Sequence, residues 1–418
     1  MNLIATHRPT VLEVIGEAAE RFHQRGDGQA VPGLEEVSPE VAAILSRELR
    51  RSREWALSPA GLAEEADELE GDDDYVSHDP AISLVQAAMD EHADEHPHEG
   101  HGMAAPLLAM IARVLGKRTA NQLPFIPPKS VDDFVFPLPS RCRVVLVGDW
   151  GTGKDRARRV ARAIAKTKPD HIIHLGDVYP SGTRSRAHKR FIDVWMEEVG
   201  EGPKYWAMNG NHEMNANGEG YFLDVLPFCG QPASFFCLKN EHWKLIAIDT
   251  AWLDADLERS QLPWLMHQLA EGPGNNILMS HHQMFSAVDR RPHNNAHKLP
   301  TTLQPAVATG RIFGWFWGHE HRSLSYAAEP RWGNYHARAI GHGGKRIRMQ
   351  EGVHLGPEFA PRVAHYWNIP REHDPSRAMN GFALLAFDGP RITIDYVDEL
   401  GRNWFTETWP DSPHGAGG

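Results

Sequence analysis

The sequence predicts a layered α/β fold preceded by a helical region. From Arg141 onward, short apolar strands alternate with amphipathic helices, as in layered α/β proteins. Before about Leu115, apolar residues recur at helical spacing and β-branched alternation is scarce. A Pro-rich stretch separates the two regions, and proline disfavours both helix continuation and sheet pairing. We therefore place a domain boundary at this stretch.

The first region is predicted to be mainly helical because Val11, Ile15, Ala18 and Phe22 share one face of a helix. Residues 64–74 are acidic, and the tract EHADEHPHEGH mixes histidine with acids. Both are too polar to pack in a core. The histidine tract is either a solvated loop or a weak auxiliary metal-binding tract.

The predicted elements follow in chain order. The segments are a helical accessory region at 1–122, a Pro-rich linker at 123–140, the α/β domain at 141–410 and a flexible tail at 411–418. Strands are predicted at 144–147, 172–175, 205–208, 234–238, 244–248, 276–279 and 312–317, and helices at 156–166, 187–199, 261–269 and 302–308. A hairpin of 382–387 and 391–397, joined by Asp388-Gly389, closes the sheet.

Composition narrows the class of protein. A formal charge of -12, from 43 basic and 55 acidic residues, argues against a broad nucleic-acid surface. The 3 cysteines indicate neither a disulfide framework nor a zinc finger. The N-terminal residues lack the pattern of a secretion signal, and no apolar run approaches the roughly 20 residues of a membrane span. We expect a cytoplasmic protein without a membrane or nucleic-acid partner.

Polar side chains follow five of the predicted strands at the point where each strand ends. These ends read VVLVGDWG, IIHLGDVY, WAMNGNHE, NILMSHH and FGWFWGHEH. Open α/β sheets place their sites at the C-terminal ends of strands. A glycine precedes the polar residue in four of these motifs, which allows a sharp turn and a close approach of the backbone. The side chains in question are Asp149, Asp177, Asn211 with His212, His281 with His282, and His319 with His321.

The chemistry of these side chains indicates a metal site. Carboxylate, amide oxygen and imidazole together suit Mn, Fe, Zn or similar ions. No thiolate belongs to the set, which disfavours a closed structural zinc site. The site is expected to stay open to a substrate.

The ordered motifs D-x-G, G-D, G-N-H-E, H and G-H-x-H resemble those of the calcineurin-like metallophosphoesterase superfamily, and most closely those of the purple acid phosphatases. The resemblance covers Arg141 to His321 and extends to about Trp404 with the closing strands. It implies a four-layer αββα sandwich and hydrolysis of phosphoric esters at two divalent or trivalent transition metal ions, Mn, Fe or Zn. The helical region lies outside it.

The resemblance also implies a role for each site residue. Asp149, Asp177 and His321 hold the first metal, and Asp177 bridges to the second. Asn211, His281 and His319 complete the second site. His212 is then the acid beside the metals.

The chain departs from the family pattern at two positions. The superfamily often has D-x-H at the first motif, but the third residue is Gly151 here. Purple acid phosphatases have a tyrosine three residues after the second aspartate, where this chain has Pro180, and Tyr179 comes one position early. We therefore do not expect the purple charge-transfer colour. Tyr179 is a ligand, a packing ring or a substrate-facing ring.

Several further residues near the motifs have two interpretations each. The ligand position directly after its strand favours His281, which leaves His282 facing the substrate or supporting a ligand. In extended backbone the Glu320 side chain points away from its neighbours His319 and His321. The polar segment 289–298 is a phosphate-binding loop or a solvated loop. Four tryptophans near the motifs stack on a nucleobase or belong to the core: Trp150, Trp315, Trp317 and Trp332.

The predicted function is metal-dependent hydrolysis of a small phosphorylated substrate, either a phosphomonoester or a phosphodiester. Two cations about 3.5–4 Å apart polarise the phosphoryl oxygens and hold a bridging hydroxide for in-line attack. His212 protonates the leaving oxygen or stabilises the developing charge. A protein Ser/Thr phosphatase is disfavoured because its G-D-x-x-D-R-G motif is absent after Gly176. The alternatives are a degenerate metal-binding scaffold without turnover and a nuclease of the same fold.

Overall fold

The structure is a computed structural model that describes residues 8–64, 75–95, 105–118, 122–288, 298–347, 349, 360–367 and 369–410. The chain forms two compact units. The helical unit comprises the chain up to Leu123 together with Tyr179–Arg186 and His212–Gly220. The α/β unit comprises Pro124–Val178, Ala187–Asn211 and the chain from Tyr221 onward. Two short segments that directly follow predicted ligand motifs therefore belong to the helical unit.

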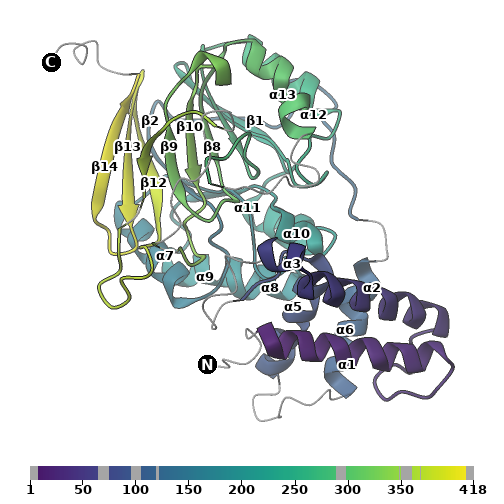
Figure 1. Ribbon diagram of the computed structural model, residues 1–418. Helices are drawn as coiled ribbons and strands as arrows, with labels where there is room; N and C mark the ends of the chain where they lie inside the picture. Colours follow the sequence, from purple (N-terminus) through teal and green to yellow (C-terminus); the bar gives the residue numbers. More distant parts are fainter. Residues whose placement is uncertain are drawn as a thin grey trace. The chain divides into compact units, whose positions relative to one another are not determined.

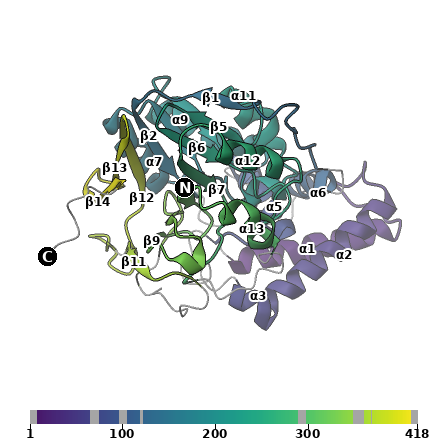
Figure 2. The same cartoon turned by 90° about the horizontal axis from the view of Figure 1, so that it is seen from above.

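The helical unit is built around a core of its own. Its helices are α1 (Arg8–Gly26), α2 (Pro39–Leu57), α3 (Pro59–Glu64), α5 (Pro80–Glu95) and α6 (Ala105–Arg118). Helices α1 and α2 lie side by side in both views (Figures 1 and 2). Val11, Ile15 and Phe22 are fully buried, as the helical spacing predicts. Helix α5 is buried at every position from Ala81 to Met89, so it runs through the centre of this unit.

Local sequence signals begin two of these helices. The Ser38 hydroxyl accepts a hydrogen bond from the Val41 N–H at 3.3 Å, and Pro39 takes the first helical position of α2. The Asp79 carboxylate accepts hydrogen bonds from the N–H groups of Ala81 and Ile82 at the start of α5. Both caps satisfy N–H groups that have no partner inside the helix.

The α/β unit contains two sheets. The larger has eight strands in the order β1-β5-β6-β7-β8-β10-β9-β11, and the smaller has six in the order β14-β13-β12-β2-β3-β4. The strands of the larger sheet are β1 (Val135–Pro137), β5 (Phe236–Lys239), β6 (Trp243–Ala247), β7 (Asn275–Ser280), β8 (Ile312–Trp317), β9 (Ser323–Tyr326), β10 (His336–Ile340) and β11 (Val363–Tyr366). Those of the smaller sheet are β2 (Arg141–Val147), β3 (His171–His174), β4 (Lys204–Ala207), β12 (Gly381–Asp388), β13 (Arg391–Asp398) and β14 (Asn403–Trp409).

The two sheets pack face to face between layers of helices, which confirms the predicted αββα sandwich. Side chains on β2 show the layering: Val144 and Leu146 pack between the sheets, whereas Val145 and Val147 pack against helices, as strand alternation requires. The helices that cover the smaller sheet are α7 (Asp155–Thr167), α9 (Asp193–Glu198) and α11 (Leu226–Cys229). Helices α12 (Gln261–Ala270) and α13 (Lys298–Ala308) cover the larger sheet and lie side by side in both views (Figures 1 and 2).

The central parallel strands set the location of the site. In the smaller sheet β2 pairs in parallel with β3, and β3 with β4. In the larger sheet β6, β7 and β8 are likewise parallel neighbours. Because parallel neighbours end at the same edge of a sheet, the loops after these strands gather at one edge of each sheet.

The structure also differs from the sequence prediction in several elements. β1 lies inside the predicted linker and pairs in parallel with β5. The predicted helix at 187–199 is divided into α8 (Arg184–Ala187), a π-helical turn at His188–Ile192 and α9.

The antiparallel pairing of β12 and β13 confirms the predicted hairpin, with Asp388 opposite Arg391. No helix of the described residues is long and apolar enough to cross a membrane.

Candidate metal centre

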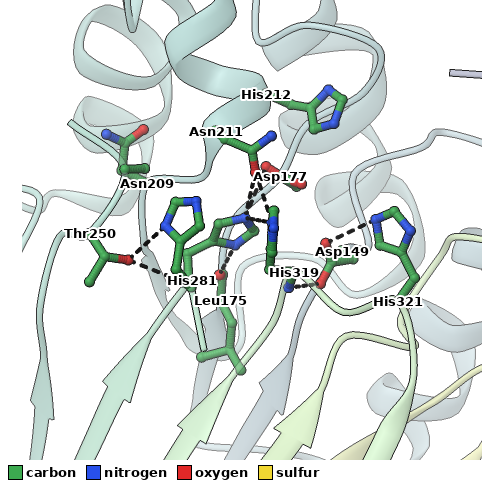
Figure 3. Close-up of polar contacts among 12 residues, drawn as sticks. Asp149, Leu175, Asp177, Asn209, Asn211, His212, Thr250, His281, His319 and His321 are labelled. Atoms are coloured by element: carbon green, nitrogen blue, oxygen red, sulfur yellow. Dashed lines mark hydrogen bonds and ion pairs between the residues drawn. The ribbon is translucent and has the colours of Figure 1, made fainter. Parts of the chain in front are cut away.

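The six side chains predicted to bind metal come together in the α/β unit, where Figure 3 shows them converging on one region. Each follows a parallel strand at its C-terminal end. Asp149 follows β2, Asp177 follows β3, Asn211 follows β4, His281 follows β7, and His319 and His321 follow β8. The fold thus unites side chains that lie up to 172 residues apart in the sequence, from Asp149 to His321. Their roles as ligands stay a prediction.

His281 is the most informative member of this cluster. Its Nδ1 lies 2.9 Å from the carbonyl oxygen of Leu175, which can only accept, so Nδ1 carries a proton. In the neutral ring Nε2 then bears a lone pair and can only accept. This atom lies 2.9 Å from Asn211 Oδ1 and 3.4 Å from Asp177 Oδ1. Three acceptor atoms facing one another repel. A proton on Nε2 or a cation among these atoms removes the repulsion.

The rest of the donor set favours a metal ion. His319 Nδ1 lies 3.1 Å from Asn211 Oδ1 and 3.3 Å from His281 Nε2. Ligand atoms of Asp149, Asp177 and His281 all lie within 4.8 Å of one another. Carboxylates, an amide oxygen and imidazoles suit Mn, Fe or Zn, and the contact of His281 with Leu175 is the kind that orients a ligating imidazole. The residues present therefore fit the predicted ions.

Asp149 connects the first motif to the last. Its Oδ2 accepts a hydrogen bond from the backbone N–H of His319 at 2.7 Å, and its Oδ1 lies 3.5 Å from His321 Nε2 (Figure 3). Asp149 is fully buried, and His321 is partly exposed. Asp149 therefore contacts the loop that carries both His319 and His321, and the assignment of Asp149, Asp177 and His321 to the first metal stays a prediction.

The backbone at four of these residues lies in the left-handed region that non-glycine residues rarely adopt. The φ angles are 55° at Asp149, 82° at Asp177, 65° at His319 and 48° at His321. Such a conformation costs about 1–2 kcal/mol per residue and persists where the surrounding structure imposes it. Its concentration at predicted ligands supports a functional origin for the strain.

Glycines allow the close approach of these loops at two positions. Gly176 has a φ of 103°, and a Cβ there would lie 2.6 Å from His281 Nδ1. Gly151 occupies the position of the histidine in the D-x-H pattern, and a Cβ there would lie 2.7 Å from the carbonyl oxygen of Asp177. Gly151 and Val178 form a parallel bridge that extends the pairing of β2 with β3. The backbone leaves no room for a side chain at position 151.

His282 lies beside the cluster. Its Nδ1 and its backbone N–H each lie 3.1 Å from Thr250 Oγ1, and Ser280 donates to its carbonyl oxygen. Its ring centroid is 4.7 Å from that of His319. Ring nitrogens of His281, His282 and His319 approach one another closely enough for His282 to serve as a further ligand.

Two residues of this environment were missed by the sequence reasoning. Thr250 holds His282, and the buried Asp249 accepts hydrogen bonds from Asn209 Nδ2 at 3.3 and 3.2 Å. Burial raises the pKa of Asp249. The signal was present, because Asp249 and Thr250 follow a parallel strand, β6, just as the predicted ligands follow theirs.

The Glu320 side chain makes its hydrogen bonds with residues other than its neighbours His319 and His321. Its carboxylate accepts hydrogen bonds from Ser286 Oγ at 2.5 Å and from Trp317 Nε1 at 2.6 Å. The side chain therefore fixes the loop that carries His319 and His321 to the segment around Ser286.

His212 and Tyr179 belong to the helical unit. Their ring centroids are 4.5 Å apart, and both side chains are buried. His212 Nδ1 lies 2.5 Å from the carbonyl oxygen of Pro180, which can only accept, so Nδ1 is the donor in this contact. Tyr179 packs against His212, and its role as a ligand stays untested.

The tryptophans belong to the core. Trp150, Trp315 and Trp317 are fully buried, and Trp150 stacks on Trp195 at 3.9 Å. A fully buried ring cannot stack on a nucleobase. Trp332 is half-buried and packs against Phe285.

Several segments named in the sequence analysis lie outside the described residues: the polar segment at 289–297, residues 96–101 of the histidine tract, residues 65–74 and the tail at 411–418.

This fold and this cluster of side chains define a metal-binding phosphoesterase. Comparisons with known proteins agree. Residues 142–323 match the family model of the calcineurin-like phosphoesterases. Mouse tartrate-resistant acid phosphatase type 5 is 24% identical over 316 residues, which cover 65% of this chain and 91% of the mouse protein. The human protein of the same name is 23% identical over 313 residues, 64% of this chain and 90% of that one.

The solved structure of purple acid phosphatase PPD1 from yellow lupin seeds is similar, with a TM-score of 0.48 and 16% identity. The match covers 65% of this chain and 55% of the lupin chain. Residues 142–323 are thus similar to a calcineurin-like phosphoesterase domain, and the helical region before them lies outside the match.

Proposed function

We propose that this chain is a metal-dependent phosphoric ester hydrolase that acts on small phosphorylated substrates with a dinuclear metal site. The observation that carries the proposal is that Asn211 Oδ1 lies 2.9 Å and Asp177 Oδ1 lies 3.4 Å from His281 Nε2, while the other ring nitrogen of His281 is held by Leu175. Such a cluster of acceptors is stable around cations. The family match of residues 142–323 supports the phosphoester as substrate.

The chain's own residues divide the work as follows. Asp149, Asp177 and His321 would hold one ion, and Asn211, His281 and His319 would hold the second together with Asp177. When bound, such a pair of ions would polarise the phosphoryl oxygens and activate a water molecule for attack on phosphorus. His212, starting as the imidazolium, would give its Nε2 proton to the leaving oxygen and become a neutral ring whose Nδ1 still donates to the Pro180 carbonyl oxygen.

A panel of substrates tests the proposal. Purified protein is dialysed against chelator, its metal content is measured by elemental analysis, and it is assayed on aryl phosphates, alkyl phosphates, phosphodiesters and cyclic nucleotides. We expect no turnover after chelation and recovery with Mn, Zn or Fe. Full activity in excess chelator after dialysis would contradict the proposal.

A degenerate metal-binding scaffold is the competing function, and Gly151 is the observation that favours it. The position cannot supply a side-chain ligand. A metal titration that shows binding without turnover of any substrate in the panel would favour the scaffold. Single-stranded DNA in the same panel, assayed at low and high salt, covers the nuclease alternative. The cytoplasmic location expected from the sequence stays a prediction.

A further inference from the structure

The carbonyl oxygen of Pro180 accepts hydrogen bonds from two side chains of the helical unit. One comes from His212 Nδ1 at 2.5 Å, and the other from the hydroxyl of Ser83 on α5. Ser83 is fully buried, and its Oγ also lies 3.1 Å from Ser181 Oγ, which donates to it. Ser83 therefore fixes the position of the same carbonyl that orients His212.

Two contacts restrain the His212 ring, one with the Pro180 carbonyl group and one with the Tyr179 ring. The carbonyl can only accept, so Nδ1 carries a proton, and the proton transfer of the proposed function is assigned to Nε2 of the imidazolium. The Tyr179 ring, packed 4.5 Å from the His212 ring, limits rotation about the side chain. A shift of Pro180 changes the direction of the Nδ1 hydrogen bond and with it the direction of Nε2.

The support behind Ser83 is rigid. Helix α5 is buried from Ala81 to Met89 and passes through the core of the helical unit. Near the other end of α5, Asp94 pairs with Arg186 at 3.2 Å, which ties the segment Tyr179–Arg186 to the helix a second time. Arg186 is almost fully buried in this pair.

The segment that carries His212 is attached to the helical unit as well. Ala216 belongs to the hydrophobic core of the helices, and the carbonyl oxygen of Asn217 accepts from the Leu123 N–H at 3.1 Å. Helices α1, α2, α3, α5 and α6 lie before residue 142, where the match to the phosphoesterase family begins, whereas the segments that carry Pro180 and His212 lie inside that match.

We propose that Ser83 is a positioning residue for His212, acting through the carbonyl group of Pro180 within the helical unit. The proposal rests on the proposed function, because it assigns the leaving-group proton to His212.

The matched control is Ser46. Its hydroxyl donates to the carbonyl oxygen of Ala19 at 2.8 Å and is buried in the same unit, where it joins α2 to α1. Ser83→Ala and Ser46→Ala each remove one buried hydroxyl-to-carbonyl bond, and Ser83→Ala also removes the bond that Ser181 donates to Ser83. Only Ser83 contacts Pro180.

The experiment compares two substrates in the metal-loaded full chain. For Ser83→Ala we expect kcat on an alkyl phosphate to fall about 10-fold, because a misplaced acid protonates a poor leaving group badly. On p-nitrophenyl phosphate, whose leaving group needs little protonation, we expect a loss within about 2-fold. Ser46→Ala should leave the ratio of the two rates at the wild-type value.

A double-mutant cycle adds a readout that a purely structural role does not move. In the His212→Ala background, Ser83→Ala should change the alkyl phosphate rate by less than about 2-fold. If Ser83→Ala does not fold, Ser83→Cys, which keeps a weaker donor at the same place, takes its role with the same expectation.

The failures are distinguishable. If the wild type hydrolyses no substrate with any metal, the proposed function fails. If the wild type is active but the Ser83 and Ser46 variants have the same ratio of rates, or the Ser83 effect persists without His212, the positioning role is overturned and the proposed function stands.

Discussion

The Nδ1 atom of His281 donates to the backbone carbonyl of Leu175, 2.9 Å away, and this contact turns the other ring nitrogen toward Asn211 and Asp177. Leu175 directly follows β3, and His281 directly follows β7, so the contact joins the two sheets of the sandwich at the site. The orientation of a predicted ligand is therefore set by the backbone of the opposite sheet.

Metal binding should stabilise the folded chain. Ions that bind only the folded state add about 2.7 kcal/mol to the free energy of unfolding when their free concentration is a hundredfold above Kd. We expect the thermal midpoint of chelator-treated protein to rise on addition of Mn or Zn. The measurement is thermal unfolding with and without metal, and an unchanged midpoint across the titration contradicts the site.

Asp177→Asn should remove both ions, because Asp177 is the residue asked to contact each of them. We expect elemental analysis to find metal content near zero and turnover to be lost. Asp388→Asn is the control. The Asp388 side chain is 71% exposed and pairs with Arg141, which is distant from it in the sequence. A variant of Asp177 that retains two ions per chain would refute the bridging role.

His212→Ala should lower kcat on an alkyl phosphate by about 10²-fold or more while metal content is retained, in line with general-acid contributions. His242→Ala is the matched control, because His242 is partly exposed and adjoins Glu241 in the turn between β5 and β6. Steady-state kinetics with metal analysis of both variants checks this. An unchanged rate on the poor leaving group removes His212 from the reaction.

Gly151→His should not restore the ligand of the D-x-H pattern. A Cβ at this position would lie 2.7 Å from the Asp177 carbonyl oxygen and 2.9 Å from Val178 Cα, both backbone atoms. We expect a loss of about 3 kcal/mol or more in unfolding free energy and reduced metal binding. Gly274→Ala, where a Cβ has open space, serves as control. A stable variant with higher metal affinity would show that the loop can rearrange.

His342 should make the fold sensitive to acid. It is fully buried against Trp367, neither ring nitrogen has a hydrogen-bond partner, and burial lowers its pKa to about 3. Between pH 6.5 and 3 the unfolded chain binds a proton that the folded chain excludes, so the free energy of unfolding falls as pH falls, by about 1.4 kcal/mol per pH unit.

Denaturant unfolding of wild type and His342→Leu at pH 7, 6 and 5 measures this slope. We expect a shallower slope in the variant. Part of the slope remains, because burial also lowers the pKa of His174 to about 3. Identical slopes in the two proteins would mean that His342 is protonated in the folded state.

Strands with an apolar run and a clear end were predictable. The predicted strand at 312–317 coincides with β8, and that at 276–279 lies inside β7. β9, β10, β11 and β14 were not predicted. Two of them show why: β9 reads SLSY and β14 reads NWFTETW, with polar residues that pair only because neighbouring strands are present.

The ligand candidates were predictable because each stands within four residues after the end of a strand, and that placement can be read from the sequence. The residues that hold these loops and side chains in place were not predictable. Thr250 holds His282, and Ser83 holds Pro180, across 32 and 97 positions of sequence. Such pairs carry no local pattern.

The sequence by itself determined the layered α/β class, the helical region and the six candidate ligands, because periodicity and strand-end residues are local properties of the chain. The tertiary structure alone decided which ring nitrogen of His281 faces the cluster, that Gly151 has no space for a side chain, and that the segments after Val178 and Asn211 belong to the helical unit. These features depend on distances between backbone atoms that meet only after the sheets and helices have packed.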